Sequence, residues 1–250
     1  MKKTIILIHG LRGTHHGLLA IAQALSGKYK VLTPDLPGSG VRAELADKTM
    51  DGYVEWLHSY VKDLKLKQKP YIVGHSMGSI IVSHYLEKYP NDVQPKVVLM
   101  SPIFRSTISQ KTSNVAFALA NGFLHLMPKT LRHKFLASKA ASFCISHYLT
   151  CDKTMQKQID QLHYRYGGRF SSADSLMADM KISMQQQTVI PPKTQPHLII
   201  GEKDKLTSLK LARATAKTHR IKIDTIPNSG HLINYERPAE VAELIVRAII

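Results

Sequence analysis

The chain has 250 residues, 44% of them hydrophobic, which is enough to bury the core of one large α/β domain and excludes a disordered protein. No apolar run approaches the ~20 residues of a membrane-spanning helix, and two cysteines, Cys144 and Cys151, do not make a disulfide framework. The 34 Lys and Arg exceed the 18 Asp and Glu, and the net charge of +16 favours anionic partners or substrates.

In the first hundred residues, predicted strands alternate with predicted helices. Residues 3–9 (KTIILIH) form a continuous apolar run, as expected for a parallel strand that is covered on both faces. Apolar side chains at helical spacing predict an amphipathic helix over residues 50–64. The other elements predicted here are a helix over 14–25, strands over 29–33, 71–74 and 96–100, and a helix over 77–88.

The same alternation returns near the C-terminus. The predicted elements there are a strand over 197–200, a helix over 207–218, a strand over 221–226 and a helix over 238–250. Pro238 occupies the first position of the last helix, which proline favours. Strands that alternate with helices predict a doubly wound, mostly parallel sheet with right-handed crossovers, here with six strands.

Residues 103–195 interrupt this rhythm with helical patterns and no convincing parallel strand. The patterns cover residues 114–127, 129–140, 154–164 and 173–184. We therefore predict a core made of residues 1–102 and 196–250, with residues 103–195 inserted as a helical cap. The insertion holds 12 Lys and Arg against four Asp, half of the net charge of the chain. Its charge gives the hypothesis that substrates are anionic.

The sequence YIVGHSMGSI (71–80) places Ser76 between Gly74 and Gly78 where a predicted strand becomes a helix. Such a turn is so tight that the serine backbone is strained and side chains do not fit at the glycine positions. The strain lifts the serine hydroxyl clear of the sheet, at the N-terminus of a helix. The alternative is a glycine-rich packing turn. The strand before the turn and the helix after it favour Ser76 as a nucleophile.

A serine nucleophile needs a base and an acid that orients the base. His231 lies in a loop between the last predicted strand and the last helix, so it is expected at the same edge of the sheet as Ser76. Asp204 follows the strand over 197–200 and is the predicted acid. Glu202 is the local alternative, and Asp224 is a weaker one because it falls within a predicted strand. The chain order is serine, acid, histidine.

The oxyanion of a tetrahedral intermediate also needs hydrogen-bond donors. The N–H of Met77, directly after the nucleophile, is one candidate. The second is the N–H of Leu11, because Gly10 and Gly13 allow the loop after the first strand to curl close to the nucleophile. The alternative for this loop is an ordinary turn at the end of a strand.

Together these segments resemble the α/β-hydrolase superfamily over residues 1–102 and 196–250, with a helical cap where many members carry one. The resemblance implies that Asp35 is structural and not catalytic. Many members have a β-hairpin before the first of these motifs, whereas eight residues precede His9 here, which predicts a compact six-stranded sheet. The segments that carry the resemblance are HG at 9–10, DLPGSG at 35–40, GHSMG at 74–78, GEKD at 201–204 and SGH at 229–231.

A serine nucleophile separates this chain from the dehalogenases and epoxide hydrolases of the superfamily, whose nucleophile is aspartate. The predicted function is hydrolysis of carboxylic esters through Ser76, His231 and Asp204 and an acyl-enzyme, without a metal or an organic cofactor. One alternative is a thioesterase that acts on acyl-CoA or acyl carriers. An alternative of another class is a non-catalytic binding protein with the same fold, which would not need all three residues.

The predicted partner is a small acyl ester, and the sequence leaves the oligomeric state open. Nucleic acid is not a predicted partner, because basic residues form no long tract and do not interleave with aromatic ones. The first ten residues, MKKTIILIHG, lack the apolar length and the cleavage site of a signal peptide. They are predicted to form a strand, and the expected location is the cytoplasm.

Overall fold

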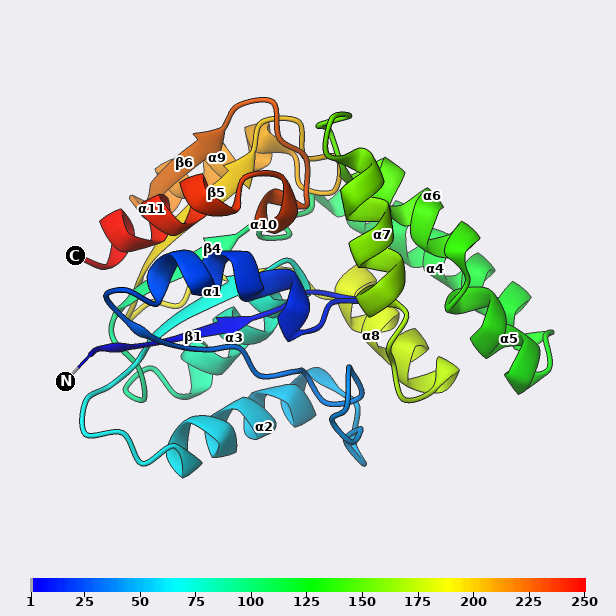
Figure 1. The fold of residues 1–250 in the computed structure, drawn as a ribbon, viewed down its shortest axis with the longest axis horizontal. Helices are drawn as coiled ribbons and strands as arrows, with labels where there is room; N and C mark the ends of the chain where they lie inside the picture. The colour runs from blue at the N-terminus through cyan, green and yellow to red at the C-terminus, as the bar shows by residue number, and fades with distance from the viewer. Residues whose placement is uncertain (1) are drawn as a thin grey trace.

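The computed structural model describes residues 2–250, apart from the side chains of residues 107–109, 113 and 116, and its six strands form one sheet with helices on both faces (Figure 1). The strand order is β2-β1-β3-β4-β5-β6, and every neighbouring pair is parallel. The predicted α/β fold is confirmed, and the sheet is parallel throughout; Met1 lies outside the described residues. The strands are β1 Thr4–Ile8, β2 Lys30–Leu32, β3 Tyr71–His75, β4 Lys96–Met100, β5 Gln195–Gly201 and β6 Lys222–Ile226.

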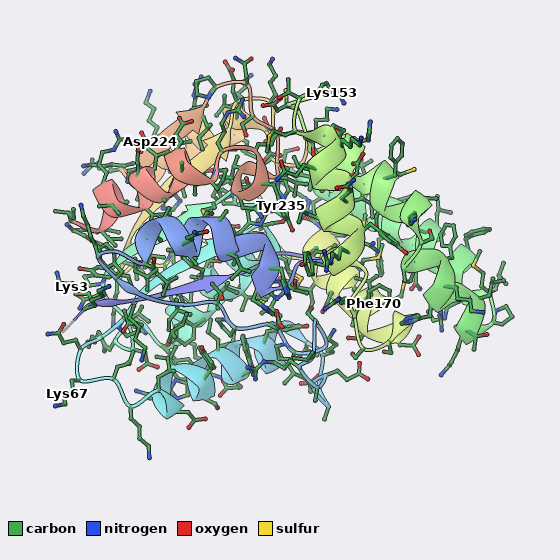
Figure 2. The ribbon with its side chains drawn as sticks, viewed as in Figure 1. Lys3, Lys67, Lys153, Phe170, Asp224 and Tyr235 are labelled. Carbon is green, nitrogen blue, oxygen red and sulfur yellow. The ribbon has the colours of Figure 1, made fainter. Side chains whose placement is uncertain are left out.

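Five helices, called here the inserted helices, separate β4 from β5 and lie beyond one end of the sheet (Figure 1). Figure 2 places Phe170 among them and Lys3 at the opposite end of the molecule. Within the described residues, no helix has the length and apolar character needed to cross a membrane. The inserted helices are α4 Thr107–His125, α5 Lys129–Leu136, α6 Lys139–Leu149, α7 Gln156–Gly167 and α8 Ala173–Gln185.

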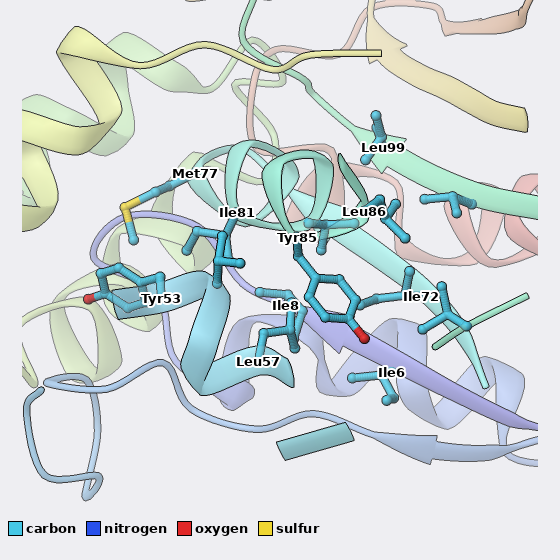
Figure 3. Close-up of a cluster of buried hydrophobic side chains, with 14 of the residues drawn as sticks. Ile6, Ile8, Tyr53, Leu57, Ile72, Met77, Ile81, Tyr85, Leu86 and Leu99 are labelled. Atoms are coloured by element: carbon cyan, nitrogen blue, oxygen red, sulfur yellow. The ribbon is translucent and has the colours of Figure 1, made fainter. Parts of the chain in front are cut away.

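The two faces of the sheet are covered by different helices because successive side chains of a strand point to opposite sides. Ile6 and Ile8 of β1 pack against α2 (Met50–Asp63) and α3 (Met77–Lys88) (Figure 3), and α9 (Leu209–His219) contributes to the same cluster. On the other face, Ile5 and Leu7 of β1 pack with residues of α1 (Leu19–Leu25) and α11 (Pro238–Ile249). The short helices η1 (His15–Leu18) and α10 (Ile233–Glu236) precede these two.

One predicted element is wrong. The helical pattern over residues 129–140 covers two helices, because α5 ends at Leu136 and α6 begins at Lys139. The Ser138 hydroxyl accepts a hydrogen bond from the Ala141 amide at 3.1 Å and caps the new helix. A serine that satisfies a free amide in this way favours the start of a helix over its interior. Helix α6 therefore runs to Leu149, where the sequence predicted no helix.

Candidate active site

Ser76 occupies a strained backbone conformation between β3 and α3. Its φ is 54° and its ψ is −120°, a region that residues other than glycine rarely adopt. The Gly78 position has no room for a side chain, since an added Cβ would overlap the carbonyl oxygens of Ile8 and His9. The strand, the tight turn and the helix therefore present the serine hydroxyl at the carboxyl end of the sheet, as the sequence predicts.

His231 contacts both Ser76 and Asp204. Its Nε2 lies 2.8 Å from the Ser76 hydroxyl, and its Nδ1 lies 2.8 Å from Oδ2 of Asp204. The three residues come from the ends of β3, β5 and β6, which meet at one edge of a parallel sheet. The Asp204 side chain is fully buried and that of His231 is 2% exposed, so water screens the pair weakly.

The Asp204 carboxylate is held by several donors. Its Oδ1 accepts hydrogen bonds from the amides of Leu206 at 2.8 Å and Thr207 at 3.1 Å. Burial opposes ionisation of Asp204, but the charge and hydrogen bond of His231 and these two amides outweigh it and lower its pKa. An ionised Asp204 accepts the hydrogen bond of Nδ1–H, and in that tautomer the lone pair of His231 Nε2 faces the Ser76 hydroxyl.

The two alternative acids lie in other interactions. Glu202 Oε2 accepts a hydrogen bond from the Asn228 amide at 3.2 Å. Asp224 on β6 pairs with His197 and with Arg247, whose guanidinium lies 2.7 Å away. Neither carboxylate forms a hydrogen bond with His231 in the part of the chain that the structure describes. Of the three candidate acids, only Asp204 is placed to orient the histidine.

The loop after β1 lies directly against Ser76. A Cβ added at Gly10 would lie 2.8 Å from Cβ of Ser76, so only glycine allows this approach. The amides of Leu11 and Met77, the two predicted oxyanion donors, donate to no backbone carbonyl in the part of the chain that the structure describes. His9 fixes the loop, because its Nε2 accepts the Leu36 amide at 2.9 Å while Nδ1 donates to the Gly10 carbonyl.

Asp35, the residue that the resemblance implies is structural, contacts His15. Its Oδ1 accepts a hydrogen bond from the His15 amide at 2.6 Å, and the His15 ring lies 2.9 Å from the same oxygen. These contacts tie the segment after β2 to the loop after β1. Asp35 forms no hydrogen bond with Ser76 or His231 among the described residues, so its contacts are structural.

Glu236 supports the loop that carries His231, and sequence reasoning missed it. One carboxylate oxygen accepts the Ser229 hydroxyl at 2.9 Å and the Gly230 amide at 2.6 Å. The other accepts the amides of Cys151 and Asp152, both at 2.7 Å. Buried glutamates are rare, but exposure is not visible in a single sequence, so no signal marked Glu236.

A cavity of about 750 Å³ opens over Ser76 between the sheet and the inserted helices. Tyr235, one of its lining residues, lies between these two parts of the molecule in Figure 2. No Asp or Glu belongs to the described lining, and no three His, Cys, Asp or Glu side chains among residues 2–250 are grouped to hold a metal ion. The apolar walls from the inserted helices include Leu136, Ala141, Ile145, Leu149, Met180 and Met184.

Comparison with known proteins identifies the family of the chain. The model of the alpha/beta hydrolase family matches residues 5–244. The chain belongs to this family. Human monoacylglycerol lipase ABHD6 is 25% identical to this hydrolase over 255 residues, which cover 98% of this chain and 74% of the relative. Lipase 3 of Moraxella sp. is 33% identical over 92 residues, or 36% of this chain and 29% of the relative.

Solved structures share the fold at lower identity. A thermophilic esterase from Thermogutta terrifontis superimposes with a TM-score of 0.76 and 17% identity, covering 100% of this chain and 90% of that one. At this identity the likeness shows the fold and no more. Family membership and the lipases among the relatives support hydrolysis of ester bonds.

Proposed function

We propose that the protein is a serine hydrolase that cleaves carboxylic esters through an acyl-enzyme. The observation that carries this proposal is the position of His231, which lies 2.8 Å from both the Ser76 hydroxyl and the Asp204 carboxylate. Nucleophile and base within hydrogen-bond reach, with the base oriented by a third group, are the geometry that activates a weak nucleophile.

In this mechanism the Ser76 hydroxyl attacks the ester carbonyl while Nε2 of His231 takes its proton. The amides of Leu11 and Met77 donate to the oxyanion of the tetrahedral intermediate. Asp204 keeps the histidine in the required tautomer and stabilises the imidazolium. His231 then gives the proton to the departing alcohol, which leaves the acyl group on Ser76. A water molecule repeats the two steps and releases the acid.

We also propose that residues 103–195 act as a cap over a core made of residues 1–102 and 196–250. The inserted helices supply the apolar walls of the cavity, and its volume of about 750 Å³ suits esters of modest acyl length. ABHD6 is named a monoacylglycerol lipase, which supports an acyl ester as substrate class.

We also propose that the protein is located in the cytoplasm, and cell fractionation tests this location.

Labelling with a fluorophosphonate tests the nucleophile. We expect the probe to label Ser76 and the Ser76→Ala protein to lose both labelling and about 10⁴–10⁶-fold of the turnover. Ser79→Ala is the matched control, because Ser79 is buried one turn further along α3 and donates to the carbonyls of Gly74 and Met100. Labelling that survives Ser76→Ala places the nucleophile elsewhere.

A substrate panel tests the ester preference. p-Nitrophenyl esters of increasing acyl length are compared with acyl-CoA thioesters at equal concentration. We expect the oxygen esters to be cleaved with the higher kcat/KM. A clear preference for acyl-CoA identifies the protein as a thioesterase, and an enzyme that labels but cleaves neither class has another acyl substrate.

A further inference from the structure

Arg12 is a buried cation in the wall of the active-site cavity. It follows Leu11 in the loop after β1, and its side chain is 8% exposed. One guanidinium nitrogen donates to the Leu136 carbonyl at 2.6 Å and another to the Ser142 hydroxyl at 3.1 Å. The side chain thus reaches from the loop beside Ser76 to the junction of α5 and α6.

These contacts leave much of the guanidinium unused. Arginine has five N–H donors, and two are engaged here, while Nε is buried with no partner among the described residues. Buried cations are normally paired with a carboxylate. Arg12 has no such partner within residues 2–250, and burial lowers its pKa to about 10. The side chain stays charged near pH 7 and lacks a counter-ion.

His163 on α7 lines the same cavity and is also incompletely satisfied. Its side chain is buried, and its Nδ1 has no hydrogen-bond partner in the described part of the chain. Burial and the nearby charge of Arg12 lower the pKa of His163 to about 4, so the ring is neutral near pH 7 and has one N–H to donate. The nearby acid, Asp160, already accepts from Ser146 and Gln156.

The other charged residues of the cavity wall are cations too. Arg105 donates to the carbonyls of Ser183 and Gln186, and Lys205 lies over the ring of Tyr148. No described residue of the lining is an acid. A cavity with cations, apolar walls and no carboxylate has a positive potential that is concentrated by its low-dielectric surroundings.

We propose that Arg12, assisted by His163, binds a negatively charged group of the ester substrate, a carboxylate or a phosphate. This inference rests on the proposed ester hydrolysis at Ser76 and names the substrate class of that site. A planar guanidinium recognises both groups through paired hydrogen bonds, and a bound anion supplies the missing counter-ion. The link from Arg12 to Leu136 and Ser142 accounts for two of its donors and leaves the others for this anion.

Three 4-nitrophenyl esters of similar length measure the preference. Mono-4-nitrophenyl glutarate carries a carboxylate, 4-nitrophenyl 4-phosphonobutanoate carries a phosphonate in place of a phosphate, and methyl 4-nitrophenyl glutarate is neutral. We expect the wild-type protein to favour one or both anionic esters in kcat/KM, and the favoured ester identifies the group. The ratio of anionic to neutral kcat/KM should fall by roughly 10- to 100-fold in Arg12→Gln, because a hydrogen bond to a charged group is lost.

Arg132→Gln is the matched control. Arg132 is a buried arginine of α5 whose Nε also lacks a partner, but it pairs with Asp174 and does not line the cavity. The ratio of anionic to neutral kcat/KM in Arg132→Gln should equal that of the wild type. The inference is wrong if Arg12→Gln leaves the ratio unchanged or if both variants lower it equally. Should Arg12→Gln fail to fold, His163→Leu answers the same question with an expected fall of roughly 2- to 10-fold.

Binding separates this inference from the proposed reaction. The probe is glutarate, titrated by calorimetry into the catalytically silent Ser76→Ala protein with and without Arg12→Gln. We expect binding that is lost with Arg12. Hydrolysis of the neutral ester without glutarate binding or anionic preference leaves the reaction standing and overturns the subsite. Glutarate binding that depends on Arg12, in a protein that cleaves no ester, supports the subsite and overturns the reaction.

Discussion

The sheet with its covering helices and the inserted helices differ in how well they are buried. The apolar clusters on the two faces of the sheet contain many side chains with no exposed surface, among them Ile6 and Leu7. The cluster of the inserted helices is small, and Leu176 is its most buried side chain. Nine of the 13 large apolar side chains that are exposed in the described chain belong to α4–α7 or the turn after α4. The sheet region therefore holds most of the folding free energy.

The two regions also contribute different groups to the candidate site. Ser76, His231, Asp204 and the Leu11 amide all come from the sheet region, whereas the apolar cavity walls come largely from the inserted helices. Rigid elements hold reacting groups in place, and less buried ones tolerate changes in shape. We expect substitutions near the sheet edge to change rate and stability, and substitutions in the inserted helices to change substrate preference.

The largest effect is predicted for the acid at the sheet edge. Asp204→Asn should keep the fold and lower kcat by roughly 10⁴-fold for every ester, because an amide favours the wrong tautomer of His231. Steady-state kinetics with two esters of different length measure this. Asp224→Asn is the control, since Asp224 contacts His197 and Arg247 and not His231. A large loss in Asp224→Asn with normal Asp204→Asn turnover would reverse the assignment.

Truncating one buried and one exposed aliphatic side chain to alanine tests the difference in burial directly. Ile6→Ala removes a side chain with no exposed surface and should lower the free energy of unfolding by about 2–5 kcal/mol. Leu119→Ala removes a side chain of α4 that is 72% exposed and should change it by no more than ~0.5 kcal/mol. Urea unfolding followed by circular dichroism measures both. Equal losses contradict the contrast between the two regions.

The two regions also contain buried neutral histidines, which makes stability depend on pH. Burial lowers the pKa to about 3 for His75, which precedes Ser76, and to about 4 for His163 of α7. Both values lie below the pKa of about 6.5 that a histidine has in the unfolded chain. As the pH falls, the unfolded state therefore binds more protons than the folded state. Each histidine therefore contributes stability that is complete above about pH 6.5 and is lost progressively below it, by roughly 1.4 kcal/mol per pH unit.

The variant His163→Leu isolates the contribution of the inserted helices to this pH dependence of stability. Between pH 7 and 5 the wild type should lose about 2 kcal/mol more unfolding free energy than the variant. Urea titrations at the two pH values measure the difference. His219→Leu, at an exposed position of α9, controls for the loss of a histidine without burial. A variant with the wild-type pH dependence shows that His163 is not buried as a neutral ring in solution.

The sequence predicted the sheet region more fully than the inserted helices. The strands and the turn around Ser76 follow from local patterns, such as an apolar run that ends in glycine, and the structure agrees with them. The placement of Asp204 also follows, because it depends on one rule about strand ends. That placement supports its proposed role, which kinetics must test.

What sequence reasoning missed depends on contacts between distant residues. Arg12 reaches a carbonyl 124 positions away, and Glu236 accepts amides of Cys151 and Asp152 some 85 positions earlier. Periodicity reports neither contact, because it reflects only which face of an element is apolar. The break between α5 and α6 was missed for a different reason, since a single serine cap outweighed a continuous helical pattern.

The smallest predicted effect concerns the surface charge of the inserted helices. Residues 103–195 carry 12 Lys and Arg against four Asp, and exposed lysines lie on each of the five inserted helices. Such charge attracts anionic substrate during encounter and is screened by salt, whereas a buried cation such as Arg12 is screened little. The kcat/KM of mono-4-nitrophenyl glutarate should fall by ~10-fold between low salt and about 0.5 M, and kcat should barely change.

Removing exposed lysines from two different parts of the surface distinguishes electrostatic steering of the substrate from a general effect of salt. The combined change Lys111→Gln, Lys134→Gln and Lys157→Gln removes exposed lysines from α4, α5 and α7 and should weaken the salt response. The equal change at Lys65, Lys67 and Lys69 is the control, because Lys67 lies on the side of the molecule away from the inserted helices (Figure 2). That control should keep the wild-type response. If methyl 4-nitrophenyl glutarate responds to salt as strongly as the anionic ester, the lysines only solvate the helix surface, and anion selection rests within the cavity.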